Sequence, residues 1–338
     1  MSGAGAIQGG AEAQVEVETV RDSDRGVPAA LLSRFRDYAI VGLVAVLFVV
    51  MSIEAKGFFS FVNFMNIIEA NAPLILIALG TTFVIISGAF DLSSGQILSL
   101  AGIVGADVAY SSSNPVLGVI VGVCVGVPAG VANGLLVSHF KVNSFLATLA
   151  TSLIFAGVAL LISGGFSQDL SANTTFRWLG SHRFGEVPAS VLVVVLVFVV
   201  LSVILTRTRL GRHIYAVGSN PEAARLSGIS VLKARTAAYA LGGLTAALGG
   251  MVLTTRTGVG SIVSEADSYT LDAIAVVVVG GTSILGGRGA LWRTAVGAAL
   301  IALVNNALNL LNVQPYWQEI VTGGIIIVAI IVNASVRD

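Results

Sequence analysis

The stretch Val191-Leu192-Val193-Val194-Val195-Leu196-Val197-Phe198-Val199-Val200 is apolar throughout and decides the fold class. A strand of a membrane barrel alternates apolar and polar side chains, whereas a helix surrounded by lipid is apolar on every side. With its flanks, the run covers residues 187–205, close to the roughly 20 residues that a helix needs to cross about 30 Å of hydrocarbon. The stretch therefore predicts a transmembrane helix.

The chain repeats this apolar pattern on both sides of residues 187–205, along most of its length. Ten apolar runs of similar length are expected as spans: 37–53, 67–89, 93–111, 115–138, 144–163, 187–205, 234–256, 269–285, 290–311 and 317–334. The fold class predicted is an all-α polytopic membrane protein with about ten transmembrane helices. The third run is the weakest, because it contains Asp107 and several Ser and Gly residues.

The composition agrees with this prediction. Of 338 residues, 55% are hydrophobic and 11% are charged, against about 25% charged in ordinary soluble domains. Mean hydropathy is +0.92. These values exclude a soluble enzyme and a disordered chain, and a formal net charge of zero excludes a basic nucleic-acid binder. The single cysteine, Cys124, excludes a disulfide scaffold.

Basic residues set the expected orientation. Residues 1–35 contain few large apolar side chains and are expected to form a disordered cytoplasmic tail, and residues 36–338 the transmembrane domain. With ten spans and the N-terminus inside, 14 Lys and Arg fall in inside segments and 4 in outside segments. Because cytoplasmic loops carry the excess of basic residues, both termini are expected to be cytoplasmic. The connection 206–235 is then inside, and 164–186 outside.

Glycine recurs at every fourth position of the run 115–138. The five glycines share one helix face and are expected to let another backbone approach closely, either as plain tight packing or beside a pathway. They are Gly118, Gly122, Gly126, Gly130 and Gly134.

Two polar breaks, 85–95 and 278–289, resemble one another, since each has glycine before and after a short polar turn. Interrupted helices often mark the substrate path in transporters, although two tight turns would explain the same pattern. Asp91, in the first break, is expected either to cap the next helix or to contact substrate. Polar residues that can bond a hydroxylated solute, or one another between helices, complete a candidate path: Asn71, Asp91, Asn133, Asn305 and Asn306.

The inside connection contains the pattern of a short capped helix. Asn220 fits an N-cap, Pro221 the first helical position, Glu222 the positive helix end, and Gly228 the C-terminal stop. The helix has one large apolar residue, Leu226, so we expect it to dock on a protein rather than to lie on lipid headgroups.

No energy-converting site is recognisable in the sequence. No lysine follows a glycine, so the glycine-rich phosphate loop that ends in Lys-Ser/Thr is absent, and no catalytic or metal-binding constellation stands out. If the chain takes part in active transport, its ATPase is expected to be another chain. An ion-driven secondary transporter remains an alternative, and it requires a buried carboxylate that titrates.

Several stretches together resemble the permease subunits of bacterial ABC sugar importers of the ribose, xylose and arabinose group. They are 207–212, 215–220, 223–224 and 227–229, with 90–93, 145–149, 271–275, 280–283 and 286–289. The resemblance runs from about residue 36 to the end. It implies a fold similar to the cobalamin-importer permease, in the bacterial inner membrane.

The resemblance also implies partners: a second permease copy in a homodimer, cytoplasmic ATPase subunits that carry ATP and Mg, and a periplasmic sugar-binding protein. The implied ATPase-coupling residues are Asn220, Pro221, Glu222, Ala223, Ala224, Arg225 and Gly228. The Ile-x-Leu-Pro ending of the usual coupling signature is missing here. A permease for branched-chain amino acids, of related design, is the alternative within the same class.

Overall fold

The computed structural model describes residues 41–42, 44–46, 48–53, 57–263, 266–314, 316–317, 320–324 and 327. The predicted tail, residues 1–35, lies outside these residues, as does most of the predicted last span. Within the predicted first span, all the described residues are helical.

Among the described residues, six helices are long and apolar enough to cross a membrane. They are α2 (Phe61–Ile86), α4 (Pro115–Ser138), α5 (Ser144–Ser163), α7 (Ala189–Arg207), α10 (Val231–Thr257) and α12 (Leu291–Leu310). The chain is thus mostly helical, as the sequence predicts. Two further predicted spans are helices α3 (Ser94–Ser111) and α11 (Ala266–Val279).

The predicted span 269–285 is wrong at its end, because α11 stops at Val279. The apolar side chains Ile284 and Leu285 continue the hydrophobic pattern, but Gly280-Gly281 interrupts the helix. Gly281 has φ of +93°, in the left-handed region that glycine enters without a Cβ clash. Residues 280–290 instead form a turn before α12.

The long connections are more ordered than open loops. The connection 206–235 holds two short helices, α8 (Arg209–Ser219) and α9 (Pro221–Leu226), and the first turn of α10. The connection 164–186 holds β1 (Gln168–Asp169), α6 (Thr174–Ser181) and β2 (Arg183–Phe184). Strand β1 pairs antiparallel with β4 (Val259–Gly260), which follows α10, and β2 pairs antiparallel with β3 (Val187–Pro188), which precedes α7.

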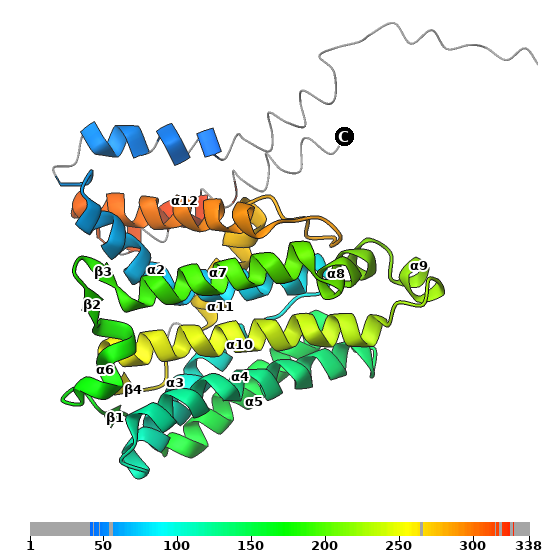
Figure 1. Cartoon of the computed structure of the whole chain (residues 1–338), viewed down its shortest axis with the longest axis horizontal. Coiled ribbons are helices and arrows are strands. Elements are labelled where there is room, and N and C mark those ends of the chain that lie inside the picture. The colour runs from blue at the N-terminus through cyan, green and yellow to red at the C-terminus, as the bar shows by residue number, and fades with distance from the viewer. Residues whose placement is uncertain are drawn as a thin grey trace, which may run out of the picture. The chain divides into compact units, whose positions relative to one another are not determined.

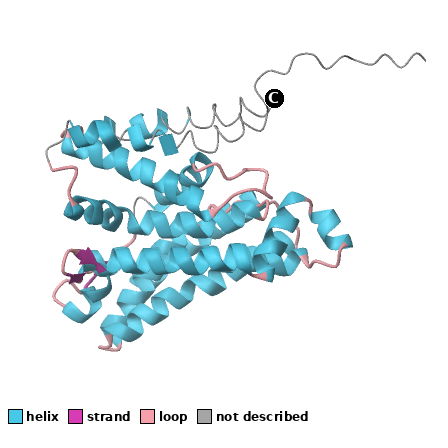
Figure 2. Ribbon diagram, turned by 45° about the horizontal axis from the view of Figure 1, so that its top comes forward, coloured by secondary structure: helices cyan, strands magenta, loops and turns pink. Residues whose placement is uncertain are grey.

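These two connections lie at opposite ends of the long helices. Figure 1 shows α8 and α9 at one end, and α6 with the four strands at the other. Figure 2 shows the same separation, with strand only at the α6 end. The end that carries α9 is called the α9 end below.

Helix α10 packs against α4, α2 and α3. Its contact with α4 involves the glycine face of α4. A Cβ at Gly126 would overlap the carbonyl oxygen of Gly243, and one at Gly130 that of Tyr239. Gly134 faces Thr236, also on α10, whereas Gly118 and Gly122 face α3 and Met251. The spacing of four therefore produces the close backbone approach that the sequence predicts.

Candidate functional site

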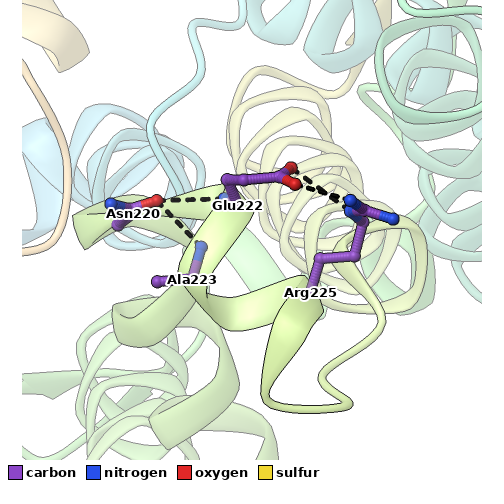
Figure 3. Close-up of polar contacts among 4 residues, drawn as sticks. All are labelled: Asn220, Glu222, Ala223 and Arg225. Atoms are coloured by element: carbon purple, nitrogen blue, oxygen red, sulfur yellow. Dashed lines mark hydrogen bonds and ion pairs between the residues drawn. The ribbon is translucent and has the colours of Figure 1, made fainter.

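Helix α9 is capped at its start by Asn220. The Asn220 side-chain oxygen accepts hydrogen bonds from the backbone N–H of Glu222 and of Ala223, each at 3.0 Å, as Figure 3 shows. Pro221 occupies the first helical position, where a missing N–H costs nothing. Two of the donors that a helix start leaves free are thereby satisfied.

The end of α9 is closed by backbone hydrogen bonds around Gly228. The Gly228 N–H donates to the Arg225 carbonyl at 3.0 Å, and the Ile229 N–H donates to the Ala224 carbonyl at 2.9 Å. This pair of bonds is the Schellman motif, and Gly228 adopts the left-handed φ of +80° that the motif needs. A helix of six residues is marginal alone, so closure at both ends fixes its length.

One face of α9 is buried and the other is free. Ala224 belongs to a buried apolar cluster that also contains Ile214 and Val217 of α8 and Leu205 of α7. Pro221, Glu222, Ala223, Arg225 and Leu226 are exposed. The buried alanine fixes the helix to the transmembrane domain, and the exposed face is available to a partner.

The exposed face carries an ion pair. Arg225 donates to the two carboxylate oxygens of Glu222, with Nη2 to Oε1 at 2.5 Å and Nε to Oε2 at 3.2 Å (Figure 3). The hydrogen bonds from Arg225 lower the pKa of Glu222, and Glu222 raises the pKa of Arg225. Both side chains are exposed, so the ion pair contributes little to the stability of the fold. Its charges lie on the face of α9 that a partner can contact.

The polar break between α2 and α3 is buried and is held by several helices. Ser144 and Thr148 of α5 accept hydrogen bonds through their hydroxyls from the backbone N–H groups of Phe90 (3.2 Å) and Leu92 (3.0 Å). The Tyr239 hydroxyl of α10 donates to the Phe90 carbonyl at 2.6 Å. These side chains thus supply the hydrogen bonds that the backbone groups lose where the helix is interrupted.

Asp91 lies inside this break and is 1% exposed. Its Oδ1 accepts from the backbone N–H of Ser93 at 2.8 Å and from the Ser93 hydroxyl at 2.7 Å. The N-cap residue of α3 is Ser93, so Asp91 lies two residues before the cap position, and its carboxylate bonds Ser93 rather than the first helical amides. Thr270 of α11 fills that role, since its hydroxyl accepts from the Gly95 N–H at 2.8 Å.

The environment of Asp91 is unusual for a carboxylate. Its Oδ2 is buried and has no hydrogen-bond partner among the described residues. Burial raises the pKa of Asp91, and the hydrogen bonds from Ser93 oppose this rise. The arrangement favours the protonated acid over the isolated charge.

Asn133 of α4 extends the same network. It is fully buried, and its Nδ2 donates to the Ser93 hydroxyl at 2.7 Å while its Oδ1 accepts from the Thr151 hydroxyl at 2.6 Å. Asp91, Ser93, Asn133 and Thr151 therefore form one continuous chain of hydrogen bonds between α3, α4 and α5.

The other three path candidates are placed elsewhere. Asn71 donates to the Ile67 carbonyl of its own helix at 2.9 Å. Asn306 pairs with Asn63 through their side-chain amides at 3.4 Å, and Asn305 accepts from Thr322 at 3.3 Å. In the part of the chain described, no hydrogen bond links these three to Asp91, to Asn133 or to one another, so of the five candidates the network joins Asp91 and Asn133 alone.

Several residues of the network were missed by the sequence reasoning. Thr270 and Tyr239 are far from the break in sequence, and nothing in their own surroundings marks them. Thr148 lies within a stretch that carries the family resemblance, which is the one signal that points to it. The described residues contain no group of three or more His, Cys, Asp or Glu side chains that could hold a metal ion.

Comparison with known proteins identifies the family. A family model described as "Branched-chain amino acid transport system / permease component" matches residues 63–330. The chain belongs to this family. The ribose import permease protein RbsC of Bacillus subtilis (strain 168) is 42% identical over 289 residues, which cover 85% of this chain and 89% of the relative.

Other relatives carry related names. RbsC of Escherichia coli (strain K12) is 36% identical over 294 residues, covering 85% of this chain and 90% of the relative. The L-arabinose transport system permease protein AraH of the same strain is 34% identical over 318 residues, covering 93% and 96%. No solved structure matches the chain.

These findings confirm the resemblance to the permeases of ABC sugar importers. The permease is a transport subunit of an ABC importer for a sugar, and its apolar helices and relatives make it a multi-pass membrane protein.

Proposed function

We propose that this permease moves ribose or a similar monosaccharide across the bacterial inner membrane. It is the non-catalytic, membrane-spanning subunit, and separate ATPase subunits drive it. The names of the relatives, which specify ribose and L-arabinose, support this class of solute. ATP and Mg are bound by the partner chain, and a periplasmic binding protein delivers the sugar.

The observation that carries the proposal is α9. It is closed at both ends, fixed to α8 by Ala224 and exposed on its other face. A rigid, anchored helix moves as one body when a partner displaces it, and its motion passes to α8 and α10. ATP-driven closure of the ATPase dimer then shifts α9 and switches the permease between outward-open and inward-open states.

We also propose ten spans, with both termini cytoplasmic. α3 and α11 supply two spans beyond the six long helices, and the runs 37–53 and 317–334 supply the others. The α9 end is then the cytoplasmic end, because the connection 206–235 is rich in Arg and Lys. This arrangement resembles the fold of the cobalamin-importer permease.

The sugar path is proposed to lie between two copies of the permease in a homodimer. Affinity belongs to the binding protein, so the path needs few strong contacts and must release the solute. The buried network of Asp91 and Asn133 supports the path from within each copy.

Import of branched-chain amino acids is a second candidate, because the family description names this solute class. The two candidates are separated by the ligand of the cognate binding protein. We expect that protein to bind ribose or another pentose in calorimetric titration, and binding of leucine in place of sugars would support the second candidate.

The coupling role is tested by Glu222→Arg. The substitution replaces the ion pair with Arg225 by two like charges on the exposed face, and it leaves the buried Ala224 unchanged. We expect ATP hydrolysis to lose its dependence on binding protein and sugar, with normal membrane insertion. Glu222→Gln, which removes the charge without reversing it, is the matched control and should have the smaller effect. Normal transport by Glu222→Arg would refute the assignment.

A further inference from the structure

A cavity of about 880 Å³ opens at the α9 end between α9, the α4–α5 turn and the start of α10. Its volume lies in the range of about 300–1,000 Å³ typical of ligand pockets, and it exceeds what one side chain fills. The polar and charged residues in its wall include Ser138, Lys141, Glu222, Arg225 and Arg235.

The cavity wall has an excess of positive charge. Three cations line it, Lys141, Arg225 and Arg235, against one carboxylate, Glu222. Glu222 is already paired with Arg225. Among the described residues, Lys141 and Arg235 have no carboxylate partner, so two positive charges face the cavity uncompensated.

Further groups in the wall favour an anionic occupant. Ser138 belongs to the wall, and its hydroxyl is buried without a hydrogen-bond partner among the described residues, so rotation of its side chain is needed for it to donate to an occupant. Helices α5 and α10 both begin at the wall, with Ser144 and Val231, whereas α4 ends there at Ser138, so two positive helix ends outnumber one negative end.

Exposed apolar side chains next to wall residues indicate a protein occupant. Phe140, which precedes Lys141 in the α4–α5 turn, is 66% exposed, and Leu226, which follows Arg225 in α9, is 77% exposed. Figure 1 shows α9 projecting beyond the ends of the long helices. Acyl chains cover the sides of membrane-spanning helices, so α9 lies outside the surface that lipid tails contact. Exposed apolar side chains around a charged pocket are typical of protein interfaces.

We propose that this cavity receives an acidic loop of the partner ATPase, so that the α4–α5 turn is the second half of the surface on which that subunit docks. Carboxylates of the loop pair with Lys141 and Arg235, and apolar residues beside them contact Phe140 and Leu226. The inference rests on the proposed function and adds to it the second docking element and the charge of the partner.

Arg235 gives this contact a route into the transmembrane domain. Its Nε donates to the Ser87 carbonyl at 3.2 Å, at the start of the polar break that holds Asp91. A carboxylate bound to Arg235 therefore acts on a side chain that already holds the break. Because Arg235 belongs to α10, the cavity gives the ATPase a second route to the break beside the displacement of α9.

The test is the affinity of the purified cognate ATPase subunit for the full permease in nanodiscs of neutral lipid. Lys141→Glu should weaken binding about tenfold or more, because it places a like charge opposite the acidic loop. Lys141→Arg keeps the charge and should bind normally. Arg212→Glu makes the same charge change on the exposed face of α8, outside the cavity, and should change the affinity less than twofold.

A second measurement identifies the occupant. A photo-cross-linking residue at Phe140 should attach to an acidic segment of the ATPase subunit. Attachment to lipid alone, or unchanged affinity for Lys141→Glu, overturns the inference. If Lys141→Glu binds normally while Glu222→Arg still uncouples transport, the inference fails and the role of α9 stands. If neither substitution has an effect, the proposed function fails as well.

Discussion

The backbone N–H of Gly287 donates a 2.8 Å hydrogen bond to the carbonyl of Ile86. Ile86 is the last residue of α2, and Gly287 lies in the turn between α11 and α12. This bond joins the two polar breaks that share a pattern in the sequence. The breaks are separated by about 200 residues along the chain and meet at the α9 end.

Helix α8 closes this junction. A Cβ at Gly218 would overlap the Ile86 carbonyl oxygen and lie 2.7 Å from the Gly287 nitrogen. The Tyr215 hydroxyl donates to the Gly289 carbonyl at 2.7 Å. Gly218 comes two residues before Asn220, so a displacement of α9 acts directly on the point where the breaks meet.

Gly218→Ala should destabilise the permease by about 1–3 kcal/mol, because the added methyl group meets fixed backbone rather than a flexible side chain. The measurement is thermal unfolding in detergent. Gly157→Ala is the matched control, since no atom lies within 4 Å of a Cβ at that position in α5. Equal melting temperatures for the two variants would contradict the close contact at Gly218.

Asn220→Ala should lower the free energy of local unfolding of α9 by about 1 kcal/mol, because two backbone N–H donors lose their acceptor. Amide hydrogen exchange over residues 221–226 should accelerate, while exchange in α10 stays unchanged. Asn220→Asp keeps an acceptor oxygen and should retain the protection. Unchanged exchange in the alanine variant would show that the cap does not hold the helix.

Asn133→Ala should cost about 1–3 kcal/mol, since it removes the acceptor of Thr151 and the donor to Ser93 inside the protein. Asn71→Ala is the comparison, because Asn71 bonds the carbonyl of its own helix and is half-buried. Chemical unfolding of the two variants should rank Asn133→Ala as the less stable. The reverse order would argue against the buried network.

Asp91→Asn should change the pH dependence of stability. Burial raises the pKa of Asp91 in the folded state, so the folded chain loses stability as the pH rises above the unfolded pKa towards the folded one. The amide keeps an acceptor oxygen and carries no charge. The variant should melt above the parent at pH 8, and the difference should shrink as the pH falls towards 4. A difference that does not vary with pH would contradict this account.

Helix ends were predictable where a capping residue marks them. The predicted runs 115–138 and 144–163 coincide with α4 and α5, because Asn114 and Asn143 cap the two helices from the positions just before them. The end of α11 was not predictable from hydropathy, since apolar residues continue past Gly280-Gly281. Helix α9 was predictable because its caps are all local.

The buried network was not predictable in detail, because its partners are far apart in sequence. Thr270 caps the helix that begins beside Gly95, and Tyr239 bonds Phe90; only folding brings them together. Asp91 stood out as a charge in an apolar region, but its bond to Ser93 depends on the backbone path of the break. In the sequence, Arg235 served only as one of the basic residues that predict the orientation of the spans. Its hydrogen bond to the Ser87 carbonyl depends on the fold.

Uptake of labelled ribose into proteoliposomes distinguishes a permease driven by a partner ATPase from one driven by an ion gradient. The vesicles contain the permease with or without its ATPase, and the binding protein is added outside. We predict uptake that requires both the ATPase and ATP on the α9 side, with none under a proton or sodium gradient alone. Gradient-driven uptake by the permease without the ATPase would contradict the account.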